Sequence, residues 1–253
     1  MKETYEKKYH ELEKNHFWHK ARRKYILQLL KESSKDVSIL DIGCSSGILL
    51  NGLVEIGFNV NSLYGIDISP KAVQQSKENG IQNSFLMDAS YIDLKRKFDI
   101  IIASDCLEHL EYDEKALRNW YEILKPGGSL YVFVPAFMIL WTAHDLANMH
   151  FRRYTRKALK KKLYESGFEI YKSSYWNFFL FLPILLFRLI SRLRSTKKQN
   201  ITGDLEEISI FNGLLFNLIN FENKLLKYVN FPFGVSTYCI AKKGKNTDYS
   251  RTA

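Results

Sequence analysis

Short apolar runs alternate with amphipathic segments in the first half of the chain, and this alternation constrains the fold more than any other feature. Five runs between residues 37 and 136 have the length and composition of β-strands, and segments with helical spacing separate most of them. Two more candidate strands lie at residues 168–176 and in "GVSTYCIAKK" near the end. Alternation of this kind predicts parallel strands joined by right-handed crossovers. The sequence therefore predicts an α/β fold with a doubly wound, mostly parallel seven-stranded sheet.

Polar or acidic side chains stand at the carboxyl ends of four of these strands. In an open α/β sheet, ligands bind at this edge, near the point where the strand order switches. We therefore expect the four strand ends to form one ligand site. The residues concerned are Asp41, Asp67, Asp88, Ser104 and Asp105.

The segment Asp41-x-Gly43-x-Ser45-x-Gly47 follows the first strand and opens a helix. Glycines in such a turn let the backbone approach a ligand, and the turn presents a helix N-terminus. A dinucleotide site would favour G-x-G-x-x-G. Here only Gly43 and Gly47 stand, with an acid two residues before the first. A carboxylate is poorly placed beside a pyrophosphate, but it is well placed beside a cation, such as a sulfonium ligand that carries an ammonium group.

These motifs together resemble the class I S-adenosylmethionine-dependent methyltransferases, whose first motif is acid-x-Gly-x-Gly-x-Gly. Ser45 replaces the middle glycine, and the resemblance extends over residues 37–134. It implies a Rossmann-like fold, S-adenosyl-L-methionine as cofactor and S-adenosyl-L-homocysteine as product. It also implies that Asp67 holds the ribose hydroxyls and that Asp88 with Ala89 holds the adenine. The stretch "SDCLEHL" would line the methionine end of the cofactor.

The N-terminal stretch "HFWHKARR" resembles a segment found in one branch of these enzymes. There Trp18 would close over the cofactor and Arg22 would meet its carboxylate. A packing tryptophan and a solvated arginine are the alternative interpretation, and His109 has either a cofactor-side or a structural role. The predicted cofactor-binding residues are Trp18, Arg22, Asp41, Gly43, Ser45, Gly47, Asp67, Ile68, Asp88, Ala89, Ser104, Asp105 and His109.

The segment "LWTAHDLANMHFRRYT" follows the fifth strand and lies where a catalytic base is expected. Methyl transfer to a hydroxyl needs alignment and a base within hydrogen-bond reach of the acceptor. Histidine titrates near neutrality, and an adjacent aspartate can orient it. We therefore predict His144, Asp145 and His150 as catalytic residues for O-methylation of a small or lipid- or glycan-linked acceptor. Structural roles and metal binding by the H-D-x-x-x-x-H spacing are alternatives, and no metal site is assigned.

The cysteines and the N-terminus indicate a cellular compartment. Cys44, Cys106 and Cys239 have no metal-ligand or CxxC spacing, which indicates a reduced, cytosolic protein without a structural disulfide or zinc site. The N-terminus lacks the apolar core of a secretory signal. No Asn-Pro-Pro-Tyr motif follows the fourth strand and no nucleic-acid-binding signature occurs, so nucleic acid is a disfavoured partner.

Basic charge is concentrated in residues 151–200, which hold thirteen Lys or Arg against two Glu, a balance of 13 − 2 = +11 in a chain of net charge +10. The segment "WNFFLFLPILLFRLISRLRSTKK" contains twelve uncharged residues, too few for a bilayer span of about 20. Pro183 is expected to interrupt it. Apolar residues beside clustered cations predict an interfacial helix on anionic lipid at 178–198. A helical cap on the sheet or on a second subunit is the alternative.

A second apolar stripe is expected to pack on this first segment. It lies within residues 205–229 and consists of Ile208, Phe211, Leu215, Leu218 and Leu225.

Four parts follow from these patterns. Residues 1–36 form a helical lid, 37–175 the cofactor-binding domain, 176–234 a hydrophobic and basic helical insertion, and 235–253 the last strand and tail. We expect a cytoplasmic protein that is peripheral on the inner face of the membrane, with oligomerisation left open. A function of another class also stays open: a non-catalytic module that binds S-adenosylmethionine or docks on membranes.

Overall fold

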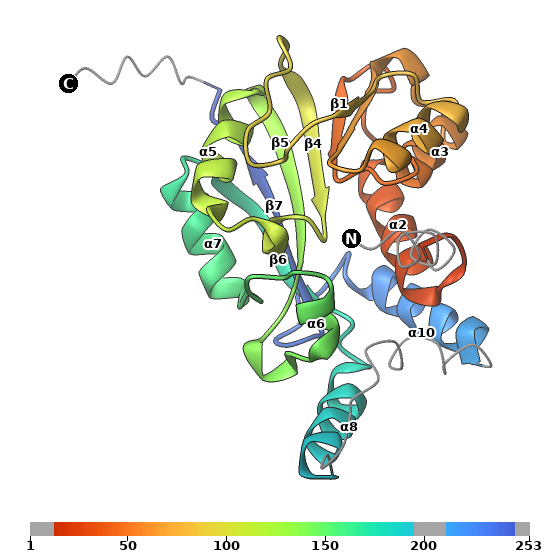
Figure 1. The fold of residues 1–253 in the computed structure, drawn as a ribbon, viewed down its shortest axis with the longest axis vertical. Helices are drawn as coiled ribbons and strands as arrows, with labels where there is room; N and C mark the ends of the chain where they lie inside the picture. The colour runs from red at the N-terminus through yellow and green to blue at the C-terminus, as the bar shows by residue number, and fades with distance from the viewer. Residues whose placement is uncertain (1–12, 195–210, 246–253) are drawn as a thin grey trace.

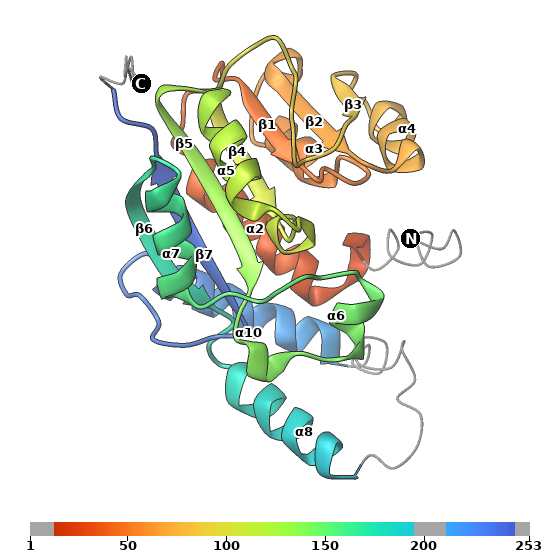
Figure 2. The same ribbon diagram turned by 60° about the vertical axis from the view of Figure 1, so that its left-hand side comes forward.

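The computed structural model describes residues 13–194 and 211–245. One seven-stranded sheet runs through the molecule in the order β3-β2-β1-β4-β5-β7-β6 (Figures 1 and 2). The first five strands are parallel, and β7 is antiparallel to both β5 and β6. The predicted doubly wound, mostly parallel sheet is thus confirmed. The strands are β1 (Ile39–Ile42), β2 (Leu63–Asp67), β3 (Ser84–Leu86), β4 (Phe98–Ser104), β5 (Leu124–Pro135), β6 (Glu169–Trp176) and β7 (Ser236–Lys242).

Helices cover both faces of the sheet and create two apolar cores. Helices α5 and α7 lie on one side, and α2, α3 and α10 lie on the other (Figure 1). The helices are α2 (Phe17–Leu30), α3 (Ile48–Glu55), α4 (Pro70–Glu78), α5 (Asp113–Glu122), α6 (Ala143–Ala147), α7 (Arg156–Glu165), α8 (Phe181–Arg194) and α10 (Asn212–Leu225). The described residues also contain three short 3₁₀ helices: η1 (Val60–Ser62), η2 (Leu107–His109) and η3 (Met138–Leu140).

Local sequence explains where the crossover helices begin. Ser69 accepts a hydrogen bond from the backbone of Ala72 at 3.1 Å, and Pro70 follows as the first residue of α4. Thr155 caps α7 in the same way, through the backbone N–H of Ala158 at 3.1 Å. These caps fix where each helix leaves the sheet edge, and so they fix the loops that form the site.

The Pro-Gly-Gly segment does not end the helix before β5 as a simple turn. It lies inside β5, where Leu124 pairs with Phe98 and Ser129 pairs with Ile100, so the intervening residues bulge out of register. Glycine is required there because Gly127 has φ 76° and a Cβ on Gly128 would lie 2.9 Å from backbone oxygens. The sequence pattern "YDEKALRNWYEILKPGG" predicts a helix closed by a Pro-Gly-Gly turn, and the turn in this prediction is wrong.

The apolar spacing predicts a helix over residues 5–34, but this helix is not continuous. Residue His16 separates a first helical stretch from α2, because its side chain accepts a hydrogen bond from the backbone of Trp18 at 3.3 Å. The part of the expected helix before residue 13 lies outside the described residues. Helix α2 itself is built into the core through Tyr25 and Ile26, each 1% exposed.

Two expectations about the insertion between β6 and β7 are wrong. Pro183 does not interrupt α8, since it occupies the first turn, where no backbone donor is needed. The second stripe packs on α2 rather than on α8. The amide of Asn223 in α10 donates to the carbonyl of Ala21 at 3.1 Å, and the Asn212 side chain accepts from the backbone of Phe17 at 2.7 Å. One member of the stripe, Ile208, lies outside the described residues.

Helix α8 projects from the lower end of the molecule, away from the sheet (Figures 1 and 2). Among the helices that the structure describes, none combines the length and the apolar character needed to cross a bilayer.

Candidate cofactor and acceptor site

The loop after β1 turns sharply and lies against β2. Gly43, Ser45 and Gly47 all have positive φ, at 76°, 48° and 75°. The backbone N–H groups of Gly43 and Cys44 both donate to the carbonyl of Ile66, at 2.9 and 3.0 Å. A Cβ on Gly47 would lie 2.4 Å from the hydroxyl of a serine in α4, so only glycine fits there. We call this tight backbone loop at the carboxyl edge of the sheet, residues 43–47, the cradle.

Two carboxylates border this cradle. Asp67, at the end of β2, accepts hydrogen bonds from the backbone N–H groups of Ser45 and Ser69, both at 2.9 Å, and so fixes the loop. Asp41 is only 4% exposed. Burial, and then the nearby Glu13 and Asp67, raise the pKa of Asp41 to about 8. A buried carboxylate beside other carboxylates fits a cationic ligand, because a cation offsets its cost of burial.

The predicted adenine side lies at the same edge, beside the ribose acid. The backbone of Met87 donates to the carbonyl of Asp67 at 3.0 Å, which brings the end of β3 against the end of β2. Asp88 then accepts from the backbone of Ser90 at 2.7 Å in a tight turn. The carbonyl of Ala89 accepts from a buried tryptophan indole at 2.8 Å. Ile68 is 74% exposed. The strand ends thus bring Asp41, Asp67 and Asp88 to one edge of the sheet, and the contacts of these residues with a cofactor stay predictions.

Arg22 is buried, so the alternative of a solvated arginine is wrong, whereas Trp18 does pack against the core. It is 3% exposed, and its Nη1 lies 3.2 Å from both carboxylate oxygens of Asp105. Its Nη2 donates to the hydroxyl of Ser236 at 2.9 Å, and its guanidinium lies 4.2 Å from the ring centroid of Trp176. Trp18 packs edge-on against the same indole, with ring centroids 5.1 Å apart. Arg22 therefore reaches the end of β4, close to the predicted methionine end.

A buried carboxylate follows β4 at Glu108, in η2. The side chain is fully buried, and neither of its oxygens has a hydrogen-bond partner in the part of the chain that the structure describes. Burial, and then the charge of Asp105, raise the pKa of Glu108 well above its usual range. Donor atoms of Glu108, His109 and His150 all lie within 4.8 Å of one another. These three side chains could hold a metal ion or a polar group of an acceptor.

Glu108 was not predicted as a site residue, although the stretch "SDCLEHL" contains it. The signal was an acid directly before a histidine after the fourth strand. Burial, and then the neighbouring His150, lower the pKa of His109 to about 4, so this imidazole is neutral near pH 7.

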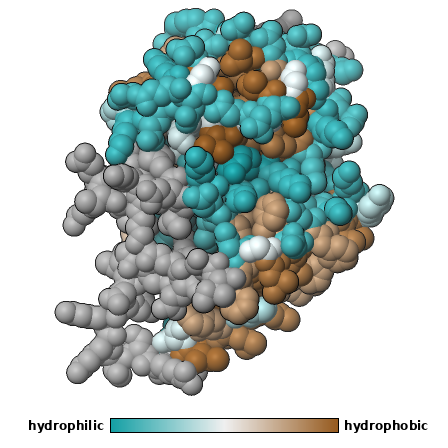
Figure 3. Space-filling view, turned by 90° about the vertical axis from the view of Figure 1, so that its right-hand side faces the viewer, coloured by the Kyte–Doolittle hydropathy of each residue, from teal (hydrophilic) through white to brown (hydrophobic). Residues whose placement is uncertain are grey.

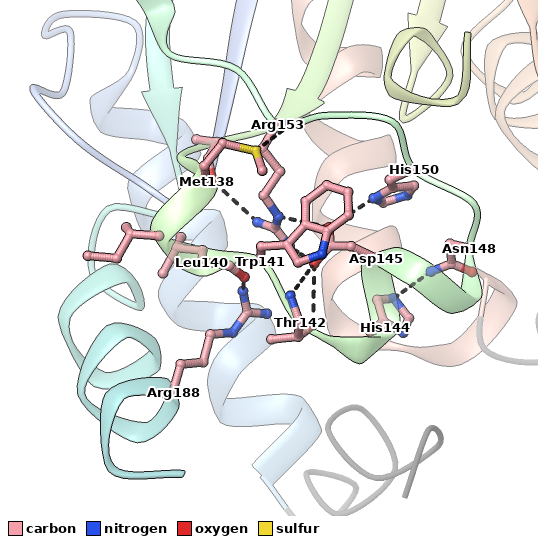
Figure 4. Close-up of polar contacts among 12 residues, drawn as sticks. Met138, Leu140, Trp141, Thr142, His144, Asp145, Asn148, His150, Arg153 and Arg188 are labelled. Carbon is pink, nitrogen blue, oxygen red and sulfur yellow. Dashed lines mark hydrogen bonds and ion pairs between the residues drawn. The ribbon is translucent and has the colours of Figure 1, made fainter. Parts of the chain in front are cut away.

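Asp145 and His150 form a pair at the carboxyl side of β5 (Figure 4). The Nδ1 of His150 lies 2.9 Å from a carboxylate oxygen of Asp145. Arg153 binds the same carboxylate through Nε at 2.8 Å and Nη2 at 3.0 Å, and the backbone N–H of Thr142 donates to it at 2.8 Å. Burial alone would raise the pKa of Asp145, but the hydrogen bonds from His150 and Arg153 hold it well below its usual range. The carboxylate is ionised and fixes the orientation of His150.

His144 takes a different partner from His150. Its Nε2 lies 2.8 Å from the side-chain amide of Asn148, and Figure 4 shows it directed away from the Asp145 carboxylate. Burial lowers the pKa of His144. The ring of His150 instead lies against His109, with centroids 4.6 Å apart. The three residues predicted as catalytic therefore divide into one hydrogen-bonded pair and a separate histidine.

The fold and the site define a class of protein. An open, doubly wound sheet with a glycine-containing loop after β1 and carboxylates at successive strand ends is the architecture of nucleotide-type ligand binding. Residues 15–173 match the family model described as a methyltransferase domain. The match covers more than half of the chain, so the chain belongs to the class I S-adenosylmethionine-dependent methyltransferase family. S-adenosyl-L-methionine is the cofactor of this family, as the resemblance implies.

Individual relatives agree with this assignment. The ubiquinone biosynthesis O-methyltransferase of Coxiella burnetii is 30% identical over 122 residues, which are 46% of this chain and 50% of that protein. The chain spans about half the length of the curated relatives it matches.

Two solved structures share the fold. The methyltransferase in complex with the Haloferax volcanii Trm112 activator has a TM-score of 0.63 at 14% identity, and the alignment covers 95% of each chain. The N-methyltransferase NodS of Bradyrhizobium japonicum, in complex with S-adenosyl-L-homocysteine, has a TM-score of 0.56 at 16% identity and covers 92% of this chain and 90% of that one. At these identities the likeness shows the fold alone.

Proposed function

We propose that this protein is an O-methyltransferase in which His150 is the general base. The observation that carries the proposal is the 2.9 Å contact between His150 Nδ1 and the buried, ionised Asp145. With Nδ1 donating to Asp145, the Nε2 atom of His150 is the proton acceptor. Asp145 holds the ring in this orientation and stabilises the imidazolium that forms when His150 takes a hydroxyl proton.

The cofactor supplies the methyl group when it is bound, and the predicted residues divide its binding among them. Asp41 borders the cradle after β1, where its buried carboxylate suits the ammonium group. Asp67, at the end of β2, is the carboxylate that would accept hydrogen bonds from the ribose hydroxyls. Asp88 and Ala89 suit the adenine, and Arg22 and Asp105 lie toward the methionine end. The alternative of a non-catalytic binding module is not favoured by the methyltransferase names of the relatives.

A hydroxyl on a small or lipid-linked molecule is the acceptor we favour. This chain matches ubiquinone biosynthesis O-methyltransferases over about half of their length. Their name supports oxygen as the methylated atom. A neutral His109 beside His150 offers a further hydrogen-bonding group to such an acceptor.

We propose that helix α8 docks on anionic lipid at the inner face of the membrane. It exposes Leu182, Leu186 and Phe187 at 55%, 58% and 58%. Apolar side chains gather at the same lower end of the molecule in Figure 3, below a mainly hydrophilic upper part. The sequence places Lys197 and Lys198 just beyond the helix. An apolar helix next to cations suits the surface of an anionic bilayer.

The alternative of a cap on the sheet has little support. The described part of α8 packs on η3, where Arg192 donates to the carbonyls of Ile139 at 2.8 Å and Trp141 at 2.9 Å. Arg188 also binds the carbonyl of Leu140. The helix is thus anchored through its arginines while its large apolar side chains face outward.

The test of O-methylation uses methyl-labelled S-adenosylmethionine with the purified protein. Catechols, simple phenols and a membrane lipid extract serve as acceptors, with aliphatic and aromatic amines as matched controls. We expect label in a base-stable ether with a hydroxyl acceptor. Label transferred to amines alone, or to none of these acceptors although the cofactor binds, would overturn the proposal.

A further inference from the structure

A glutamate from the N-terminal segment reaches into the cofactor loop. The carboxylate oxygen Oε2 of Glu13 accepts a hydrogen bond from the hydroxyl of Ser45 at 2.6 Å. The backbone of Glu13 is held separately, since Nη1 of Arg23 in α2 donates to its carbonyl at 3.3 Å. This contact joins parts of the chain that are 32 residues apart.

The partner of Glu13 is the position at which this chain departs from the family motif. Ser45 has φ 48°, in the left-handed region that favours glycine, and a non-glycine residue there costs on the order of 1 kcal/mol. Glycine would avoid this cost but has no hydroxyl to offer Glu13. The serine therefore gives the loop a contact that the usual motif cannot make.

The contact brings a third carboxylate to the cradle. Burial raises the pKa of Asp41 most, and the charges of Glu13 and Asp67 raise it further. Asp41 is itself 4% exposed, and its carboxylate has no hydrogen-bond donor among the described residues. Asp67 differs because backbone N–H groups bind it. A buried carboxylate without a donor, in a field made more negative by Glu13, suits a ligand with positive charge.

We propose that Glu13, held by Ser45, is a third carboxylate of the cofactor site and favours the sulfonium cofactor over its thioether product. The proposal rests on the cofactor site described under the proposed function. S-adenosylmethionine and S-adenosylhomocysteine share the adenosine, ammonium and carboxylate groups, and they differ by the methyl group with the positive charge that it gives to sulfur. A negative side chain stabilises that additional charge and does nothing comparable for the neutral thioether.

The experiment measures the dissociation constants of both molecules by calorimetry for the wild type, Glu13→Gln, Ser45→Gly and the double variant. Glu32→Gln is the matched control, because it removes an exposed carboxylate beyond the end of α2. We expect Glu13→Gln to reduce the preference for S-adenosylmethionine by about five- to tenfold, mainly by weakening that ligand. Ser45→Gly should reduce it in the same direction, and the double variant should lose no more than Glu13→Gln alone.

The outcomes separate this inference from the proposed function. If the wild type binds neither molecule, both the cofactor site and this inference fail. If the wild type binds both, and Glu13→Gln keeps the wild-type ratio, the role of Glu13 is wrong and the cofactor site stands. Equal weakening of both ligands by Glu13→Gln would likewise overturn selection of the sulfonium, since it would indicate a structural contact or an interaction with the ammonium group that both ligands share. Unfolding curves of each variant show that the protein is folded during the titrations.

Discussion

His150 and His144 are six residues apart on one segment, but they have different partners. His150 is oriented by the buried Asp145, and His144 binds the amide of Asn148. Only His150 also lies against His109 and Glu108, in the group of donor atoms after β4. The sequence pattern predicts both histidines as catalytic, and only their different packing partners distinguish them.

Their different partners lead to a kinetic prediction. His150→Gln should lower kcat by about 10²- to 10⁴-fold, the usual contribution of a general base, with little change in cofactor affinity. His144→Gln is the matched control and should keep kcat close to the wild-type value. Steady-state kinetics with the hydroxyl acceptor provide the measurement. An equal loss in both variants, or no loss in His150→Gln, would rule out His150 as the base.

Asp145 also contributes to stability, because it is fully buried and binds Arg153 and His150. Removing one partner of a buried pair leaves an uncompensated charge, so Asp145→Ala should lower the free energy of unfolding by about 3–5 kcal/mol. Replacing both partners, as Asp145→Leu with Arg153→Met, should cost less. Urea denaturation measures both variants. A double variant less stable than Asp145→Ala would contradict this account.

The same carboxylate predicts a direction of pH dependence. Its pKa is lowered in the folded state, so its stabilisation is complete above the unfolded pKa of about 3.9 and is lost as the pH falls toward the folded pKa. The wild-type free energy of unfolding should therefore decrease more steeply than that of Asp145→Asn below about pH 4. Parallel decreases in the two proteins would show that Asp145 does not titrate in this way.

At the scale of elements, α8 is attached to the rest of the molecule in an unusual way. Its arginines bind the carbonyls of η3, and its apolar side chains are exposed. The segment that α8 binds, η3, is followed directly by α6, which contains Asp145. Docking of α8 on lipid would thus occur next to the segment that orients the base.

Membrane docking is tested by replacing two exposed residues of this helix. Leu186→Glu with Phe187→Glu should abolish flotation with vesicles of phosphatidylglycerol and phosphatidylcholine, because charges replace the apolar contact. Tyr164→Glu, at a 75% exposed position on α7, is the matched control and should float like the wild type. Equal flotation of both variants would contradict docking through α8. If the Leu186→Glu, Phe187→Glu variant still floats but no longer forms dimers, α8 is instead an interface between subunits.

The elements themselves were largely predictable from the sequence, because their signals are local. The apolar run of β4, the Ser69–Pro70 start of α4 and the glycine loop after β1 each depend on neighbouring residues. The packing of α10 on α2 was not predictable, since hydrogen bonds between residues about two hundred positions apart decide it. The bulge at Gly127 also depends on a partner strand, and no pattern within its own segment reveals it.

At the scale of the whole molecule, the sheet accounts for most of the predicted site. Parallel strands deliver their carboxyl ends to one edge, so Asp41, Asp67 and Asp88 were expected to meet there, and the structure places them there. The burial of Glu108 and the contact of Glu13 with Ser45 were not predictable, because each depends on how distant segments close over that edge. The sequence thus predicts which edge binds a ligand better than it predicts what covers the edge.

The central claim is that this edge binds S-adenosylmethionine through the carboxylates after β1 and β2. Calorimetric titration of Asp67→Ala against the wild type tests it most directly, with Asp93→Ala as the control at a 54% exposed carboxylate. Loss of hydrogen bonds to a charged group should weaken binding of the cofactor by at least about tenfold, while the control keeps wild-type affinity. Wild-type affinity in Asp67→Ala, or a wild type that binds a nicotinamide cofactor in place of S-adenosylmethionine, would contradict the account.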